Sequence, residues 1–200
     1  KLTKNKIYDI VSIAIIFLSI SFLTFLGIYG TPFNIDFVVL FSGAYSIIQG
    51  VFPYVHFPLP PFPFPFFLQA FFQLILGSNL KAMMMHSIFL SSILCISFYY
   101  LSKKYLGRFF AVILAMFLHY AFIGIITYPW YNQHALLFLF LNIFLLIKDL
   151  FKKVSPKVIF ILSYLLVFLG IISKTDIGLL HFIGVSLYFL YSYRDNLRGA

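Results

Sequence analysis

The sequence predicts an all-α protein that crosses a membrane several times, as a polytopic transmembrane helix bundle. Hydrophobic residues make up 62% of the 200 residues, charged residues make up only 10%, and the mean hydropathy is +1.03. A soluble domain has roughly 45–50% apolar and about 25% charged residues, and a chain of this length cannot hide so much apolar surface from water. A soluble enzyme, a nucleic-acid-binding domain and a disordered chain are therefore excluded.

Six apolar runs are predicted to span the membrane as helices, because about 20 apolar residues cross a hydrocarbon core of ~30 Å. The fourth and fifth runs are short, but their amphipathic flanks extend them. The six runs are Ile7–Ile28, Ala82–Leu101, Phe109–Ile126, Ala135–Ile147, Val158–Ile172 and Ile177–Tyr191.

A seventh apolar run, Phe64–Leu76, is predicted to be an interfacial or re-entrant helix. Its length of about 13 residues gives only ~20 Å of helix, too short to cross. Gln69 and Gln73 are four residues apart and share one helix face. Another face carries the apolar side chains Phe67, Phe71, Phe72 and Leu76.

The distribution of cations supports this choice. The chain has 14 Lys and Arg against 5 acidic residues, all of them Asp, and the cations form small groups between the apolar runs. If Phe64–Leu76 does not span, the positive-inside rule places every cation except Lys81 and Lys174 on the inner side. We therefore expect a plasma-membrane protein with both ends cytoplasmic and a first extracytoplasmic segment at residues 30–81. The chain is interpreted as one transmembrane module, residues 1–200, and its ends suggest a piece of a longer protein.

The outer segment contains two predicted juxtamembrane helices and a stiff connection. The first helix, Phe37–Ile48, has a polar stripe at Ser42, Ser46 and Gln49, which suits the membrane interface. The Pro- and Phe-rich stretch Pro58–Pro65 needs no helical hydrogen bonds. Two such helices joined by a rigid strap predict a shallow apolar groove for a ligand with a lipid tail.

Asp36 is the only acidic residue of this segment, just before the first juxtamembrane helix. A carboxylate there is favoured by the helix N-terminus, so a simple capping role is one interpretation. The other interpretation is a general base at the membrane surface.

The order of these features resembles the N-terminal module of the polytopic GT-C glycosyltransferases, which include protein mannosyltransferase, aminoarabinose transferase and rhizobial lipid-A glycosyltransferase-like groups. The basic loop Lys103–Arg108 and the outer stretch Lys174–Gly178 also fall where that family has comparable features. The residues that carry the resemblance are Asp36, Gly50-Val51-Phe52-Pro53-Tyr54, Pro58–Pro65 and Leu76-Gly77-Ser78-Asn79.

The resemblance implies a membrane enzyme of the cell envelope that transfers a sugar from a polyprenyl-phosphate donor to a lipid, glycan or protein acceptor on the outer face. It implies that Asp36 binds or deprotonates the acceptor. Many members have Asp-Glu where this chain has Asp36-Phe37, and some have a Lys where this chain offers His56. We therefore expect the phosphate to be stabilised by Lys81 or Lys174, the outer cations, or by a C-terminal part of the protein beyond this piece. This piece alone is expected to be inactive.

Further candidate substrate-binding residues lie in two outer loops. Aromatic faces stack on sugars and amides bond hydroxyl groups, although an interfacial aromatic belt explains the same pattern. The candidates between the third and fourth spans are Tyr128, Trp130, Asn132, Gln133 and His134. In the last outer loop, Asp176 either contacts a substrate or forms a local ion pair with Lys174. Lys174 itself either extends its ammonium group to the membrane interface or binds the phosphate.

No cofactor is expected beyond the lipid-phosphate sugar donor, and no metal site is expected. His56, His134 and Asp36 are the only alternative metal set, and they lack the spacing of known zinc motifs. Two other functions remain open: a transporter or flippase fragment, and a non-catalytic membrane scaffold. A transporter predicts broken helices at the membrane midplane, whereas here the irregular stretch lies outside.

Overall fold

The structure is a computed structural model that describes residues 4–30, 35–57, 63–123, 129–147 and 154–198. The described residues form seven helices and no strand, which confirms the predicted all-α helix bundle. The helices are α1 (Lys4–Gly30), α2 (Ile35–Ile48), α3 (Phe64–Leu76), α4 (Leu80–Ile123), α5 (Tyr131–Leu146), α6 (Pro156–Ile171) and α7 (Thr175–Arg198).

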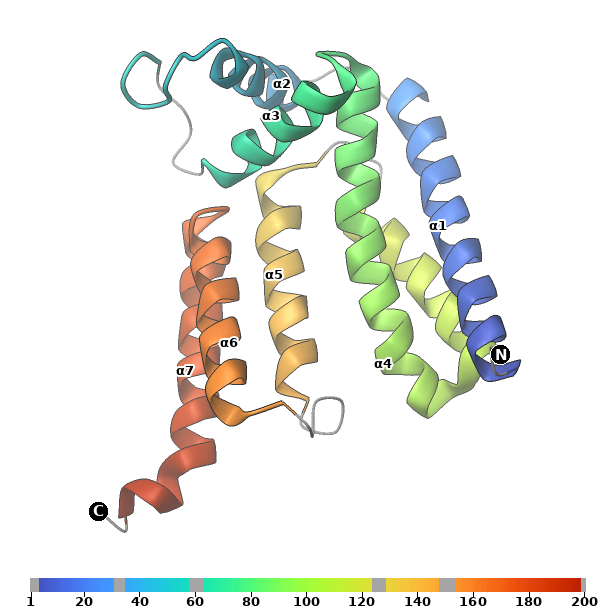
Figure 1. Ribbon diagram of the computed structural model, residues 1–200, viewed down its shortest axis with the longest axis vertical. Coiled ribbons are helices and arrows are strands. Elements are labelled where there is room, and N and C mark those ends of the chain that lie inside the picture. The colour runs from blue at the N-terminus through green and yellow to red at the C-terminus, as the bar shows by residue number, and fades with distance from the viewer. Residues whose placement is uncertain (1–3, 31–34, 58–62, 124–128, 148–153, 199–200) are drawn as a thin grey trace.

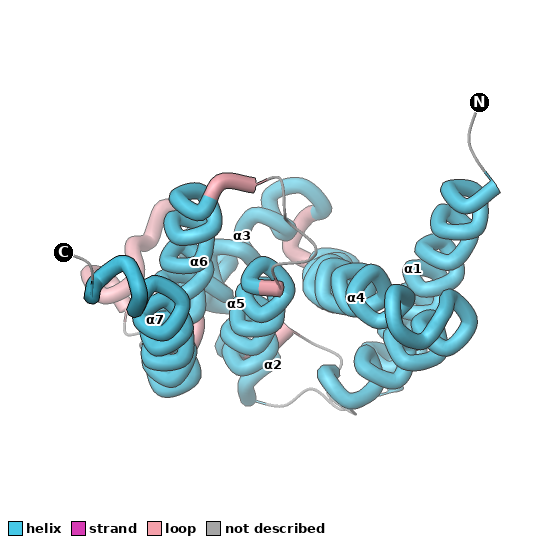
Figure 2. Tube along the Cα trace, turned by 90° about the horizontal axis from the view of Figure 1, so that it is seen from below, coloured by secondary structure: helices cyan, strands magenta, loops and turns pink. Residues whose placement is uncertain are grey.

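The long helices lie side by side, and the two short helices of the predicted juxtamembrane segment lie across one end of them (Figure 1). The two termini of the chain lie at the opposite end, and the view along the bundle shows α1, α4, α5, α6 and α7 roughly end-on (Figure 2). We call the first end the α2–α3 end and the second the terminal end.

Helix α3 has the predicted bounds, Phe64–Leu76, and does not run along the bundle (Figure 1). Gln69 and Gln73 do share a face, and that face is turned into the protein, where they are 0% and 2% exposed. Phe67 and Phe71 are 50% and 53% exposed. The polar face of α3 is thus buried and its apolar face is exposed, which is the reverse of a helix on the surface of a soluble protein. In lipid, polar side chains must find their partners inside the protein.

Helix α4 contains two predicted spans in one element. It turns back at Gly107, whose φ of 75° and ψ of 169° are not helical. We expected a basic loop at Lys103–Arg108, and this is wrong: the helix continues to the kink at Gly107 and resumes at once. Glycine adopts a positive φ without a steric penalty, so the single residue Gly107 makes the turn for which a loop was expected. The end of the predicted span Phe109–Ile126 lies outside the described residues.

Three of the described helices are long and apolar enough to cross a membrane: residues 4–28, 80–121 and 175–192. Helices α5 and α6 have 16 residues each, shorter than a typical span. Helix α5 begins at Tyr131, earlier than predicted, because the Gln133 side-chain oxygen accepts a hydrogen bond from the Trp130 N–H at 2.9 Å. In α6, Ser155 is the N-cap and accepts from the Val158 N–H.

The apolar core is divided along the bundle. Ile16, Ile20 and Tyr99 belong to a cluster between α1 and the two halves of α4. A second cluster, at the α2–α3 end, joins Leu40, Phe66 and Tyr131. It packs α2 and α3 against the start of α5 and thereby positions the candidate site.

Candidate functional site

Asp36 lies in the first turn of α2 and is half-buried. The free N–H groups of a helix start favour a carboxylate there. Within the described part of the chain, Asp36 forms no ion pair and accepts no side-chain hydrogen bond.

Tyr131 is the residue of α5 that packs towards α2 and α3. It shares an apolar cluster with Leu40 of α2 and Phe66 of α3. Tyr131 is 5% exposed, and its ring lies 5.7 Å from that of Phe66. Tyr131 is not among the candidates from the sequence, because its packing with Leu40 and Phe66 follows from the fold and not from its local sequence.

The other candidates around the start of α5 have different surroundings. The ring centroid of Trp130 lies 4.0 Å from that of Tyr131. Asn132 is half-buried, and its Oδ1 has no hydrogen-bond partner among the described residues. Gln133 is 8% exposed and is engaged in the helix cap. Tyr128 lies outside the described residues.

His134 is fully buried in a row of hydrogen-bonded side chains. Its Nδ1 lies 2.7 Å from the Trp130 carbonyl oxygen, and its Nε2 lies 2.9 Å from Nε2 of His86. His86 Nδ1 in turn lies 2.9 Å from the side-chain amide of Gln69 on α3. We call these four residues the histidine row. From the sequence, Gln69 is only part of a polar helix face, and His86 is not among the candidate site residues.

His56 lies in a turn after α2 and is exposed. Its Nδ1 accepts a hydrogen bond from the Phe52 N–H at 3.0 Å, and its own N–H donates to the Phe52 carbonyl. These bonds close the turn that leads towards the Pro-rich stretch. Residues 58–62 of that stretch lie outside the described residues, so the predicted groove stays a prediction.

Lys81 is exposed in the first turn of α4. The cap of this helix is Asn79, whose Oδ1 accepts hydrogen bonds from the N–H groups of Lys81 and Ala82 at 2.9 and 3.3 Å. In the described residues the Lys81 ammonium forms no ion pair. Its side chain is therefore available to an anionic partner.

Lys174 and Asp176 lie at the turn between α6 and α7. Their charged atoms are 3.6 Å apart, so the local ion pair that the sequence offered as one interpretation is present. Asp176 also accepts a hydrogen bond from the Ile177 N–H at 2.9 Å. The backbone of this turn contacts the start of α3, where the Phe64 N–H donates to the Ile172 carbonyl at 3.3 Å. Both residues thus belong to the α2–α3 end.

No group of three or more His, Cys, Asp or Glu that could share a metal ion occurs in the described ranges. His134 faces His86, and His56 faces Phe52.

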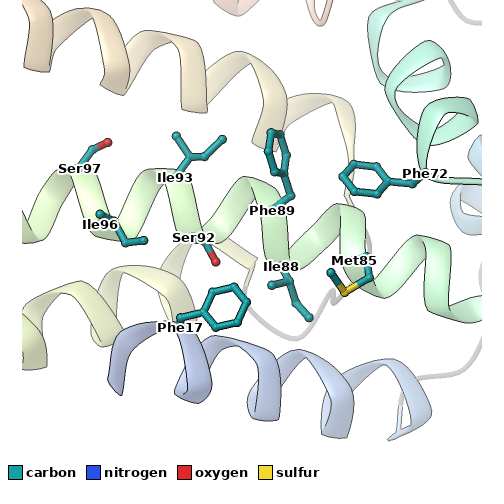
Figure 3. Close-up of a pocket in the computed structure, with 9 residues that line it drawn as sticks. All are labelled: Phe17, Phe72, Met85, Ile88, Phe89, Ser92, Ile93, Ile96 and Ser97. Atoms are coloured by element: carbon teal, nitrogen blue, oxygen red, sulfur yellow. The ribbon is translucent and has the colours of Figure 1, made fainter. Parts of the chain in front are cut away.

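An apolar cavity of about 420 Å³ lies beside α4, between α1 and α3 (Figure 3). Phe17 of α1 and Phe72 of α3 line it from two sides. Phe72 also stacks on His86, with ring centroids 5.2 Å apart, so one aromatic ring separates the cavity from the histidine row.

The terminal end has a charged cluster that we did not predict. The Asp9 carboxylate lies 2.7 Å from Lys103 Nζ and 3.2 Å from Arg108 Nε, and it accepts a hydrogen bond from the Tyr99 hydroxyl at 2.8 Å. Arg108 also donates to the Asn5 side-chain oxygen at 3.0 Å. The cluster joins α1 to both halves of α4 across the Gly107 kink.

Comparison with known proteins gives one family. No curated protein and no solved structure matches the chain. The family described as dolichyl-phosphate-mannose-protein mannosyltransferase matches residues 58–198, which include α3 to α7. Asp36 precedes the matched region. The chain therefore belongs to the dolichyl-phosphate-mannose-protein mannosyltransferase family, whose members are membrane glycosyltransferases of the GT-C type.

Proposed function

We propose that this protein transfers a sugar from a polyprenyl-phosphate donor to a hydroxyl acceptor at the α2–α3 end, on the outer face of the membrane. The observation that carries the proposal is the half-buried Asp36 carboxylate, which has no cation partner in the described residues. Family membership supplies the reaction class, because the family name itself specifies a lipid-linked sugar donor.

The step that we assign to Asp36 is proton removal. The carboxylate takes the proton of the acceptor hydroxyl while the acceptor oxygen forms a bond to the anomeric carbon of the sugar. The bond between that carbon and the phosphate oxygen breaks, and polyprenyl phosphate leaves with the electron pair. A carboxylate that was already neutralised by a cation would be a weaker base for this step.

The phosphate that departs needs positive charge or hydrogen-bond donors. Lys81 is the better candidate, because its ammonium is exposed and forms no ion pair in the described part of the chain. Lys174 is half-buried and already lies 3.6 Å from Asp176. Trp130 and Asn132 are proposed to contact the sugar, whereas Gln133 and His134 support the helix start from inside the protein. The apolar walls of the cavity at Phe72 suit an isoprenoid chain.

A choice of donors tests the reaction class. The protein, reconstituted in lipid vesicles with a hydroxyl acceptor, is given mannose on polyprenyl phosphate or mannose on a nucleotide diphosphate. We expect transfer only from the lipid-linked sugar. Transfer from the nucleotide sugar alone would contradict the proposed donor.

Cysteine labelling tests the outward orientation of the α2–α3 end. Ser78 and Tyr105 are both exposed and lie at opposite ends of the first half of α4, while the native Cys95 is buried. In intact cells we expect a membrane-impermeant maleimide to label S78C and to spare Y105C. Labelling of Y105C alone would place the proposed site on the inner face and overturn this part of the proposal.

A further inference from the structure

We propose that the histidine row, Gln69–His86–His134–Trp130, is a positioning element that fixes the start of α5 against α3 and against α2, the helix that carries Asp36. This inference rests on the proposed function, since it assigns the row a part in that reaction. Gln69, His86 and His134 are not proposed to touch the substrate, and Trp130 takes part in the row only through its backbone carbonyl.

The row has a direction that one carbonyl group determines. The Trp130 carbonyl oxygen can only accept, so His134 Nδ1 donates to it at 2.7 Å. In an uncharged ring Nε2 of His134 then accepts, and His86 Nε2 donates to it at 2.9 Å. His86 Nδ1 is left as an acceptor and needs a donor.

Gln69 supplies that donor from α3. Its Oε1 lies 2.9 Å from His86 Nδ1, and its Nε2 has no hydrogen-bond partner among the described residues. The two ends of an amide have the same shape, so the orientation that points the nitrogen at His86 completes an uncharged row. Each of the three side chains then has one defined role, and none can be replaced by an apolar residue without leaving a buried polar neighbour unpaired.

The row is closed off from lipid and water by aromatic rings of α3. Phe72 stacks on His86 at 5.2 Å, and the edge of Phe64 meets His134 at 6.1 Å. His86 and His134 are both 0% exposed. A hydrogen bond in such surroundings is stronger and more directional than one in water.

The row connects the elements that surround Asp36. It runs from α3 through α4 to the Trp130 carbonyl, and the next residue, Tyr131, shares an apolar cluster with Leu40 of α2, the helix that carries Asp36. Four residues beyond Gln69, Gln73 Nε2 donates to the Phe41 carbonyl of α2 at 3.1 Å. The buried face of α3 therefore holds α2, which carries Asp36, and the start of α5, which carries Tyr131.

The test compares single and double apolar substitutions. H86L and H134L each leave a buried partner unpaired, so we expect both to lower the thermal unfolding temperature. The double variant H86L/H134L removes both partners of the central bond and should regain most of that stability. H119L is the matched control, because His119 is a buried histidine of α4 that lies outside the row.

Two readouts separate positioning from packing. Trp130 is the only tryptophan of the chain, so its fluorescence emission and its quenching by acrylamide report the start of α5 directly. The second readout is the turnover number for sugar transfer. We expect the double variant to be stable, with Trp130 more accessible than in the wild type and turnover reduced by at least about tenfold. H86Q, which keeps a donor towards His134, should restore both readouts in part.

Recovery of both the Trp130 signal and turnover in H86L/H134L would show that the row only fills space and would overturn the proposal. Unchanged readouts in the single variants would do the same. If the wild type transfers no sugar from the lipid donor, the proposed function fails. The Trp130 readout still decides whether the row positions α5.

Discussion

The two ends of the bundle treat a carboxylate in opposite ways. At the terminal end Asp9 is engaged by Lys103, Arg108 and Tyr99, at 2.7, 3.2 and 2.8 Å. At the α2–α3 end Asp36 forms no ion pair or side-chain hydrogen bond with any described residue. The elements around Asp36 are joined by the neutral side chains of the histidine row and by Gln73.

This difference separates a carboxylate with a structural role, Asp9, from one that is available for a reaction, Asp36. The Asp9 cluster uses charge to join α1 to α4 where the chain turns back at Gly107. Both oxygens of the Asp9 carboxylate already contact hydrogen-bond donors. The α2–α3 end is held by hydrogen bonds between uncharged groups and by close packing, and none of these hydrogen bonds engages the carboxylate of Asp36. Rigid support by uncharged groups is what a positioned general base requires.

The largest effect on stability is expected at Gly178, where α6 and α7 approach most closely. A Cβ there would lie 2.4 Å from backbone atoms of Ile171, next to the turn that contacts the start of α3. G178A should destabilise the protein by about 3 kcal/mol or more, because backbone must move to admit the methyl group. Thermal unfolding in detergent measures it.

G184A is the matched control for this substitution, since a Cβ at Gly184 meets nothing within 4 Å. We expect it to leave the unfolding temperature unchanged or slightly raised. Equal unfolding temperatures for G178A and G184A would show that close packing does not hold the α2–α3 end.

A smaller loss of stability is expected for D9N. Asparagine keeps an oxygen for the Tyr99 hydroxyl but removes the charge that faces Lys103 and Arg108. The side chains of this cluster are between 20% and 40% exposed, so we expect a loss of about 1–2 kcal/mol. A D9N protein as stable as the wild type would remove the structural role that we give to the terminal end.

The smallest effect is the salt dependence of that loss. Partly exposed ion pairs weaken as the Debye length falls from about 10 Å at 0.1 M salt to about 3 Å at 1 M. The stability difference between D9N and the wild type should therefore shrink at 1 M NaCl, while the loss caused by H86L should not change. A shared salt dependence would mean that the two ends are not held by different forces.

The helical architecture could be predicted from the sequence, because a helix that crosses lipid needs a long run of apolar residues. Every predicted helix is present, and α3 has the predicted bounds. The face of α3 was also predicted from spacing, since Gln69 and Gln73 must share a side. Which side points inward could not be read from the spacing, because it depends on partners from α2, α4 and α5.

Long-range polar pairing was harder to predict. Asp9 falls within the first predicted span, Ile7–Ile28, and an acid inside an apolar run is itself a signal that it has a partner. Its partners lie some ninety residues away, and Arg108 reaches it from beyond the kink at Gly107. The packing of Tyr131 with Leu40 likewise arises from the docking of α2, which no local pattern encodes.

The most direct test of the different roles of Asp9 and Asp36 is to measure sugar transfer and thermal unfolding for D36N and D9N side by side. We predict that D36N unfolds like the wild type but transfers sugar from polyprenyl phosphate at least about 100-fold more slowly, as expected for loss of a general base. D9N should unfold at a lower temperature and transfer sugar at nearly the wild-type rate while folded. Near-normal turnover in D36N would contradict the account.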